Sequence, residues 1–318
     1  MDGSVLVLGD LHFTGRAESP WSALWREGGG IPRLLAAAGR IARNFDVSLA
    51  IQVGDLVDGD FANEAEYEGS LGAAWNAVKR ALTSTPLVAV PGNHDVASPE
   101  GAFAWDLSIP SRIARELSRP ILQTNFAIPF GDDALICIDS PHPDETVVAL
   151  PKLLAETAGC RRTIVVLHHP VLPVYYGLSY RSILFGDPSL DDMRLDALSR
   201  LAKRGAIILC GHVHTCGFAD WFGAGGRIVQ IHLSSLWDGK EPGLRQTHDS
   251  PDEYGRFYEL AGCAEAAAFF AEFRPGLAAY RHFEGAGFAM LESSSRGVFV
   301  SFHAGDPSSP ACRIGIDD

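Results

Sequence analysis

Five short segments of the sequence carry aspartate, asparagine and histidine side chains at the ends of apolar runs. They are Asp10-Leu11-His12, Gly54-Asp55, Gly92-Asn93-His94-Asp95, His168-His169-Pro170 and Gly211-His212-Val213-His214. In each case a strand-like run comes first and a turn follows, so the polar side chains can converge from successive strand ends. Carboxylate and amide oxygens combined with imidazoles suit divalent or trivalent first-row metals, rather than calcium alone or a thiolate zinc site. The pattern therefore predicts a metal site.

Each segment also has an ordinary structural explanation. Asp10 could cap a turn or a helix, Gly54-Asp55 is common in turns, and Asn93 could close an Asx-turn. One histidine of the pair at 168 and 169 could simply be packed in the core. A metal site is favoured because all five ordinary explanations would have to hold together to remove it.

Taken in order, the segments resemble the motifs of the calcineurin-like metallophosphoesterase superfamily: Asp-x-His, Gly-Asp-x-x-Asp, Gly-Asn-His-Asp, His-His-Pro and Gly-His-x-His. They run from residue 10 to residue 214, and beyond that point the resemblance is architectural only. It implies an α/β fold of four layers, an αββα sandwich of two mixed sheets flanked by helices, with a dinuclear metal site at the strand ends. One such domain is expected over residues 1–318.

The resemblance also implies the metal ligands. A first metal would be held by Asp10, His12 and His214, a second by Asn93, His168 and His212, and Asp55 would bridge the two. His168 is preferred to His169 as the ligand because the family's ligand lies two residues before the proline.

Three further residues are expected to support the chemistry. In the family pattern His94 is not a ligand, and it would protonate the leaving oxygen or stabilise charge on the phosphoryl group. Asp95 could orient the His94 imidazole, and Asp58 would orient one of the ligands. A proton relay of this kind typically contributes ~10²–10⁴-fold to the rate.

Two metals suit the hydrolysis of a phosphate ester, the reaction that the resemblance implies, because the attacking hydroxide and the anionic ester repel each other. Metals ~3.5–4 Å apart clamp the phosphate oxygens and lower the pKa of water from ~15.7 towards ~7, so a hydroxide that bridges them can attack in line. Manganese, iron, zinc or a mixed pair fits the ligand set.

The composition favours a small anionic substrate, and the resemblance implies that this substrate is phosphorylated. A formal net charge of −13 argues against binding to nucleic acid or to an anionic membrane. The motif style is closest to the cyclic-nucleotide and glycerophosphodiester phosphodiesterase branch, which favours a small phosphodiester or a nucleotide-like phosphomonoester. The alternatives are a non-catalytic scaffold on the same fold and a nuclease of the superfamily.

Loops between the motifs should determine specificity. Aromatic residues with a nearby arginine, which suit a planar group plus a phosphate, occur in loops 13–30 and 171–185. The substrate candidates are His169, Tyr175, Tyr176 and Arg181; the alternative is that these aromatic residues cover a sheet edge. The stretch 237–254 is polar and turn-rich and is predicted to be an insertion or a lid.

Apolar patterning predicts alternating strands and helices with an antiparallel pair of strands near 287–302. The expected strands are Val5–Leu8, Leu49–Val53, Leu87–Val90, Ala134–Ile138, Thr163–Leu167, Ala206–Leu209, Arg227–Leu233, Gly287–Leu291 and Gly297–Phe302. The expected helices are Pro32–Asn44, Glu64–Thr83, Asp192–Lys203 and Cys263–Phe273. Six scattered cysteines without a C-x-x-C pair, no secretory signal and no long apolar run predict a cytoplasmic protein without a disulfide framework.

Overall fold

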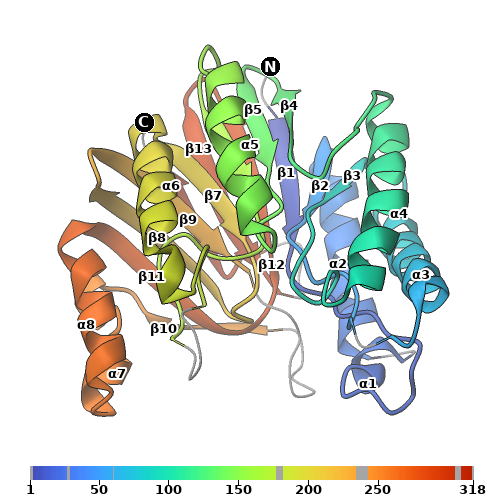
Figure 1. Ribbon diagram of the computed structural model, residues 1–318, viewed down its shortest axis with the longest axis horizontal. Helices are drawn as coiled ribbons and strands as arrows, with labels where there is room; N and C mark the ends of the chain where they lie inside the picture. The colour runs from blue at the N-terminus through green and yellow to red at the C-terminus, as the bar shows by residue number, and fades with distance from the viewer. Residues whose placement is uncertain are drawn as a thin grey trace.

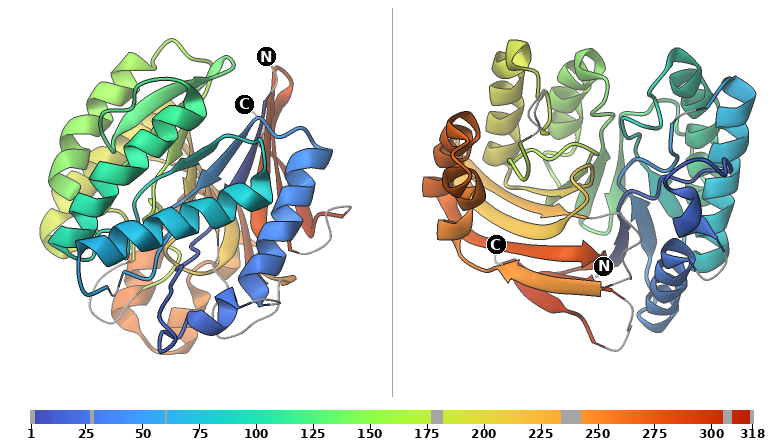
Figure 2. Two further views of the ribbon diagram at one scale, coloured as in Figure 1. Left: turned by 90° about the vertical axis from the view of Figure 1, so that its right-hand side faces the viewer. Right: turned by 90° about the horizontal axis from the view of Figure 1, so that it is seen from below.

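Two β-sheets form the centre of the molecule and helices cover their outer faces (Figure 1). The computed structural model describes residues 3–26, 29–59, 61–176, 182–233, 243–304 and 309–316. Figure 2 shows helices α5 and α6 on one side of the sheets and α2 and α3 on the opposite side. This is the predicted αββα arrangement.

The first sheet has six strands in the order β14-β13-β12-β1-β2-β3. Their bounds are β1 (Gly3–Leu8), β2 (Leu49–Gln52), β3 (Leu87–Ala89), β12 (Phe288–Ser294), β13 (Gly297–His303) and β14 (Cys312–Ile316). Strands β1, β2 and β3 are parallel, whereas β12, β13 and β14 add to them in antiparallel fashion. The late antiparallel pair expected from the sequence is therefore present.

The second sheet has eight strands in the order β10-β11-β8-β9-β7-β6-β5-β4. Their bounds are β4 (Phe126–Phe130), β5 (Asp133–Cys137), β6 (Thr163–Val166), β7 (Ala206–Cys210), β8 (Cys216–Gly223), β9 (Gly226–His232), β10 (Gly243–His248) and β11 (Leu277–Ala286). Strands β5, β6, β7 and β9 are parallel, and the outer strands are antiparallel. Both sheets are therefore mixed.

The helices connect the strands and pack against the sheets. They are α1 (Ser22–Trp25), α2 (Gly30–Asn44), α3 (Glu64–Leu82), α4 (Pro99–Leu117), α5 (Pro143–Glu156), α6 (Asp191–Arg204), α7 (Arg256–Leu260) and α8 (Ala264–Phe273), with 3₁₀ turns at Pro188–Leu190, Pro251–Glu253 and Arg274–Gly276. Within the described residues, no helix combines the length and the apolar character that crossing a membrane requires.

The apolar core consists of two clusters, one on each face of the second sheet, because successive side chains of a strand point to opposite faces. In β7, Ile207 and Leu209 join the apolar cluster shared with the first sheet, whereas Ile208 and Cys210 join a cluster under the outer helices. Burial on both faces gives β6 and β7 the continuous apolar sequences seen in them.

All expected strands and helices are present, but others escaped the sequence patterns. Helices α4 and α5 each contain an internal proline, Pro110 and Pro151, which breaks the sequence pattern expected of a helix. Within the predicted insertion, residues 237–242 lie outside the described residues. Gly243–His248 is an edge strand of the second sheet, and a 3₁₀ turn follows it.

Candidate metal centre

The polar segments follow parallel strands of both sheets. Asp10, Asp55 and Asn93 come after β1, β2 and β3, His168 comes after β6, and His212 comes after β7. The carboxyl ends of parallel strands meet at one edge of a sheet, so each sheet delivers its polar side chains to one place. The packed sheets bring both sets together.

The first group of candidate ligands consists of Asp10, His12, Asp55 and His214. One ligand atom from each lies within 4.8 Å of the others. The Nε2 atoms of His12 and His214 are 3.2 Å apart, and Asp10 Oδ2 lies 3.2 Å from His214 Nε2. Asp10 and His12 are almost completely buried.

The second group lies beside the first and shares Asp55. Ligand atoms of Asp55, His168 and His212 lie within 4.8 Å of one another. The side-chain oxygen of Asn93 is 3.0 Å from His168 Nε2 and 2.9 Å from His212 Nδ1. Asp55 Oδ2 lies 3.7 Å from His12 Nε2 and 3.3 Å from His168 Nε2, so one carboxylate oxygen stands between the two groups.

The chemistry of these donors fits a pair of metal ions. Two buried carboxylates need a compensating positive charge, and facing imidazole nitrogens need a shared electron-pair acceptor. A divalent cation meets both requirements at once. Within the described residues, the arrangement is a His/Asp cluster that could hold metal ions.

The same charges change the acidity of the groups. Burial would raise the pKa of Asp55, but the charge and hydrogen bond of His168 hold it well below its usual range. Burial would lower the pKa of His168, but Asp55 and Asp10 raise it to about 9. Burial lowers the pKa of His12 and of His212 far below the ordinary histidine value, which favours the neutral form that ligates metal.

Four of the candidate ligands have a left-handed backbone. The φ angles are 45° at His12, 53° at Asp55, 71° at His212 and 51° at His214. Non-glycine residues rarely adopt this conformation, and such residues gather at functional sites where the surrounding structure compensates the strain. The tight bends aim side chains back towards one centre.

Glycines of the motifs make room for ligands that come from other motifs, as Gly54 does for the His168 ring. A Cβ atom on Gly92 would collide with the backbone nitrogen and carboxylate of Asp55, and one on Gly211 would collide with the carboxylate of Asp10. These positions must lack a side chain because a ligand occupies the space. The glycines therefore belong to the geometry of the site as well as to its turns.

His94 stands next to the ligands but is oriented differently from the expectation. Its Nδ1 lies 2.6 Å from the backbone carbonyl of Asp58, and its backbone N–H donates to Asp55 Oδ1. Asp95, which was expected to orient the His94 ring, instead accepts hydrogen bonds from the backbone N–H groups of Leu56, Val57 and Gly92. The Asp95 carboxylate thereby links the loop that carries Asp55 to the loop that carries Asn93.

The Asp58 carboxylate accepts a hydrogen bond of 2.6 Å from Ser19 Oγ. A carboxylate oxygen of Asp58 also lies within 4.8 Å of ring nitrogens of His12 and His94. Asp58 therefore contacts the edge of the site through both its backbone and its side chain.

The substrate candidates are placed unequally. The His169 ring lies 4.5 Å from the His212 ring, centroid to centroid, and its Nδ1 is 2.9 Å from Ser140 Oγ. Tyr175 is half exposed, whereas Tyr176 packs against Tyr258 and donates its hydroxyl hydrogen to Glu265. Tyr176 packs on aromatic rings of α7 and α8. This favours the alternative interpretation for Tyr176, in which it covers a sheet edge and does not contact substrate. Arg181 lies outside the described residues.

Sequence reasoning missed two residues that contact the site. Trp21, one of the aromatic residues of loop 13–30, is buried and stacks on His12. Ser140 Oγ accepts hydrogen bonds from the backbone N–H groups of His168 and His169. Ser140 and His168 are 28 positions apart, so local patterns carry no signal for their contact, whereas Trp21 lies only nine positions after His12.

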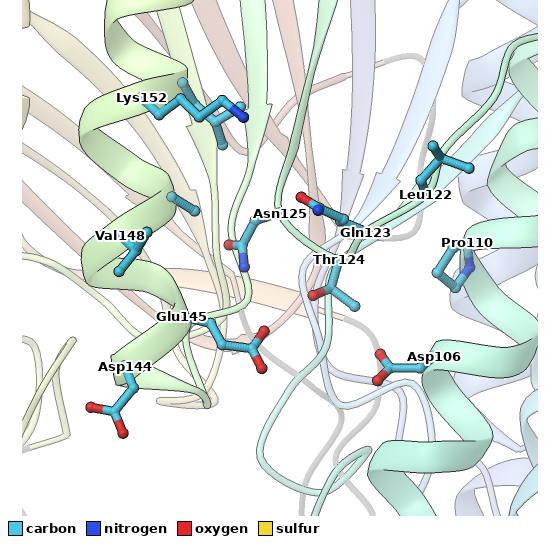
Figure 3. Close-up of a pocket in the computed structure, with 12 residues that line it drawn as sticks. Asp106, Pro110, Leu122, Gln123, Thr124, Asn125, Asp144, Glu145, Val148 and Lys152 are labelled. Atoms are coloured by element: carbon cyan, nitrogen blue, oxygen red, sulfur yellow. The ribbon is translucent and has the colours of Figure 1, made fainter.

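Two cavities lie near the sheet edge. One of about 690 Å³ is bounded by α4, α5 and the segment before β4, and Asp106, Glu145 and Lys152 are among its lining residues (Figure 3). It includes none of the candidate ligands. The other, of about 420 Å³, is lined by His169 and Ser140 and so adjoins the metal groups.

Two mixed sheets between helices, with His/Asp groups at their edge, define an α/β protein with a metal site. The model of the calcineurin-like phosphoesterase family matches residues 3–216, and the chain therefore belongs to that family. It is a hydrolase that acts on phosphoric ester bonds.

Three solved structures share the fold over 99% of this chain. GAP50, the anchor in the inner membrane complex of Plasmodium, is 12% identical with a TM-score of 0.56 over 89% of its length. PhoD is 9% identical with a TM-score of 0.58 over 68% of its length. A dimetal phosphatase from Danio rerio is 12% identical with a TM-score of 0.53 over 98% of its length. A search of curated proteins found no match.

Proposed function

We propose that this protein hydrolyses a small phosphate ester, either a phosphodiester or a nucleotide-like phosphomonoester, at a centre of two metal ions. The observation that carries the proposal is the position of Asp55 Oδ2, 3.7 Å from His12 Nε2 and 3.3 Å from His168 Nε2. A single carboxylate in reach of two histidine groups is the arrangement needed to bridge two metals.

The ligand assignment follows the two groups. Asp10, His12 and His214 would hold one metal, Asn93, His168 and His212 would hold the other, and Asp55 would bridge them. Manganese, iron and zinc all suit these donors. When bound, such a pair supplies positive charge to the phosphate oxygens and makes water acidic enough to act near neutral pH.

His94 is the proposed general acid. The Asp58 carbonyl can only accept a hydrogen bond, so Nδ1 of His94 carries a proton; the acid would be the imidazolium form, whose second proton, on Nε2, passes to the leaving oxygen and leaves a neutral ring. The backbone N–H of His94 donates a hydrogen bond to Asp55 Oδ1, and this bond fixes the position of the general acid relative to the bridging carboxylate.

The small size of the substrate is supported by charge and space. A formal net charge of −13 disfavours long polyanions, and the cavity of about 420 Å³ beside His169 offers room for the alcohol part of a small ester. Both points agree with the cyclic-nucleotide and glycerophosphodiester phosphodiesterase branch, which we propose as the closest in function. A nuclease is disfavoured by the same charge.

A non-catalytic scaffold is the rival explanation, since GAP50, a protein of the same fold, is described as an anchor. Against it stands the complete set of ligands together with His94. The deciding experiment adds manganese, zinc or iron back to metal-depleted protein and follows one chromogenic phosphomonoester and one phosphodiester. We expect metal-dependent turnover of at least one. Metal binding without turnover of either would favour the scaffold.

A further inference from the structure

We infer that Trp21 is a positioning residue for the metal ligand His12, whose ring it holds by stacking in place of a hydrogen bond. The inference rests on the proposed metal centre and concerns how one of its ligands is oriented. Its basis is a difference between His12 and another candidate ligand, His168.

The His12 imidazole is completely buried, yet one of its two nitrogens is unsatisfied. Nε2 faces the metal groups, 3.2 Å from His214 Nε2. Within the described residues, Nδ1 is buried without a hydrogen-bond partner. Buried polar atoms normally have a partner, so another interaction must determine the orientation of this ring.

His168 shows the usual arrangement. Its Nδ1 lies 3.0 Å from the backbone carbonyl of Val53, while its Nε2 faces the metal groups. A hydrogen bond on the far nitrogen fixes both the tautomer and the orientation of a ligating imidazole. In His12 the corresponding nitrogen lacks this support.

Trp21 makes a stacking contact that can orient the His12 ring. Its ring centroid lies 4.0 Å from that of His12, and the two rings are within 11° of parallel. The same indole meets the His214 ring at a steep angle, 5.7 Å between centroids. Trp21 is only 4% exposed. One side chain therefore restricts two ligands of the same metal position.

The loop that carries Trp21 is itself attached to the site. The Trp21 backbone N–H donates to Ser19 Oγ, and Ser19 Oγ donates to the Asp58 carboxylate at 2.6 Å. Four residues further on, the Trp25 indole N–H donates to the carbonyl of Leu11, the residue before His12. These hydrogen bonds fix the Trp21 indole relative to the backbone of His12.

Removing the indole should let the His12 ring rotate away from the orientation that presents Nε2. Loss of a group that orients a ligand typically costs ~10–100-fold in metal affinity. We expect that loss at the position of His12 and His214. The position of His168 keeps its own hydrogen bond to Val53 and should be affected less.

The test compares Trp21→Leu, Trp21→Phe and the control Trp221→Phe, which changes a buried tryptophan of β8 that packs against Phe273. Manganese binding to metal-depleted protein is followed through the electron paramagnetic resonance signal of the free ion, and melting of the metal-free proteins monitors folding. Trp21→Leu should weaken one of two sites by ~10–100-fold. Trp21→Phe, which keeps an aromatic face, should retain most of the affinity, and Trp221→Phe should bind like the wild type.

Two results would overturn the inference. One is wild-type affinity at both sites in Trp21→Leu, and the other is equal weakening at both sites together with a lower melting temperature of the metal-free protein. Binding is measured without substrate. A wild type that binds two ions but hydrolyses no ester would therefore contradict the proposed function and leave the role of Trp21 intact.

Discussion

The Nε2 atoms of His12 and His214 lie 3.2 Å apart, although 202 positions separate the two residues in the chain. His12 follows β1 of the first sheet, and His214 follows β7 of the second. This pair of ligand atoms comes together only when the two sheets are packed. Metal binding and tertiary folding should therefore be thermodynamically coupled.

The first prediction is that added metal stabilises the fold. A ligand that binds the native state alone contributes roughly 2.7 kcal/mol at a free concentration 100 times its dissociation constant. Melting of metal-depleted protein should therefore shift upwards with manganese concentration. A melting temperature that is independent of manganese would contradict the coupling.

The second prediction concerns His94→Ala. The backbone N–H that donates to Asp55 remains in this variant, so both metals should still bind. Loss of the proton donor should lower kcat by ~10²–10⁴-fold for an alkyl phosphate ester. The loss should be much smaller for a nitrophenyl ester, whose leaving group needs little protonation. Equal losses for both esters, or normal turnover, would remove His94 from this role.

The third prediction contrasts two glycines. Gly211→Ala places a methyl group against the Asp10 carboxylate, so it should weaken metal binding and lower stability. The control Gly69→Ala lies on an exposed part of α3 with no neighbouring atom within 4 Å of the added carbon. There alanine should stabilise by about 0.5–1 kcal/mol. Metal titration and chemical unfolding of both variants measure the contrast, and wild-type metal affinity in Gly211→Ala would refute it.

The fourth prediction is a pH dependence at the start of α5. The hydrogen bond from His142 Nδ1 to Asp139 Oδ1, 2.9 Å long, and the charges of Asp139, Glu145 and Asp106 raise the pKa of His142. A raised pKa means that the native state binds the proton more tightly than the unfolded state. The stabilisation is therefore complete below about pH 6.5 and is lost as the pH rises through the raised pKa.

The variant His142→Gln isolates this contribution. The difference in melting temperature between wild type and variant should be larger at pH 6 than at pH 9. His142 is partly exposed, so solvent screens the pair and the effect should be modest. If the difference in melting temperature is the same at both pH values, or is larger at pH 9, the His142–Asp139 pair does not stabilise the protein through a raised pKa of His142.

The sequence located the strand ends because buried parallel strands leave an unmistakable apolar signature, as in Thr163–Val166 and Ala206–Cys210. It missed α4 and α5 because an internal proline normally ends a helix, and tertiary packing overrides that preference here. It also missed the antiparallel strands β8 and β11. Their glycines and polar residues blur the alternation that identifies a strand.

The candidate ligands were identifiable because their types and order follow a pattern, whereas the residues that orient them follow none. The left-handed backbone of His12 and His214 depends on turns that the packed sheets enforce. The contacts of Asp95 with the backbone of Leu56 and Val57 join separate loops, so its role as a tie was not visible. Trp21 was noticed as an aromatic residue, but only the fold turns it towards His12.

The central claim, that Asp55 joins two metal ions, can be tested by anomalous X-ray scattering from crystals of the protein loaded with manganese. Two peaks about 3.5–4 Å apart should lie on either side of the Asp55 carboxylate. One should be next to His12 and His214, and the other next to His168 and His212. A single peak, or two peaks that do not share Asp55, would contradict the account.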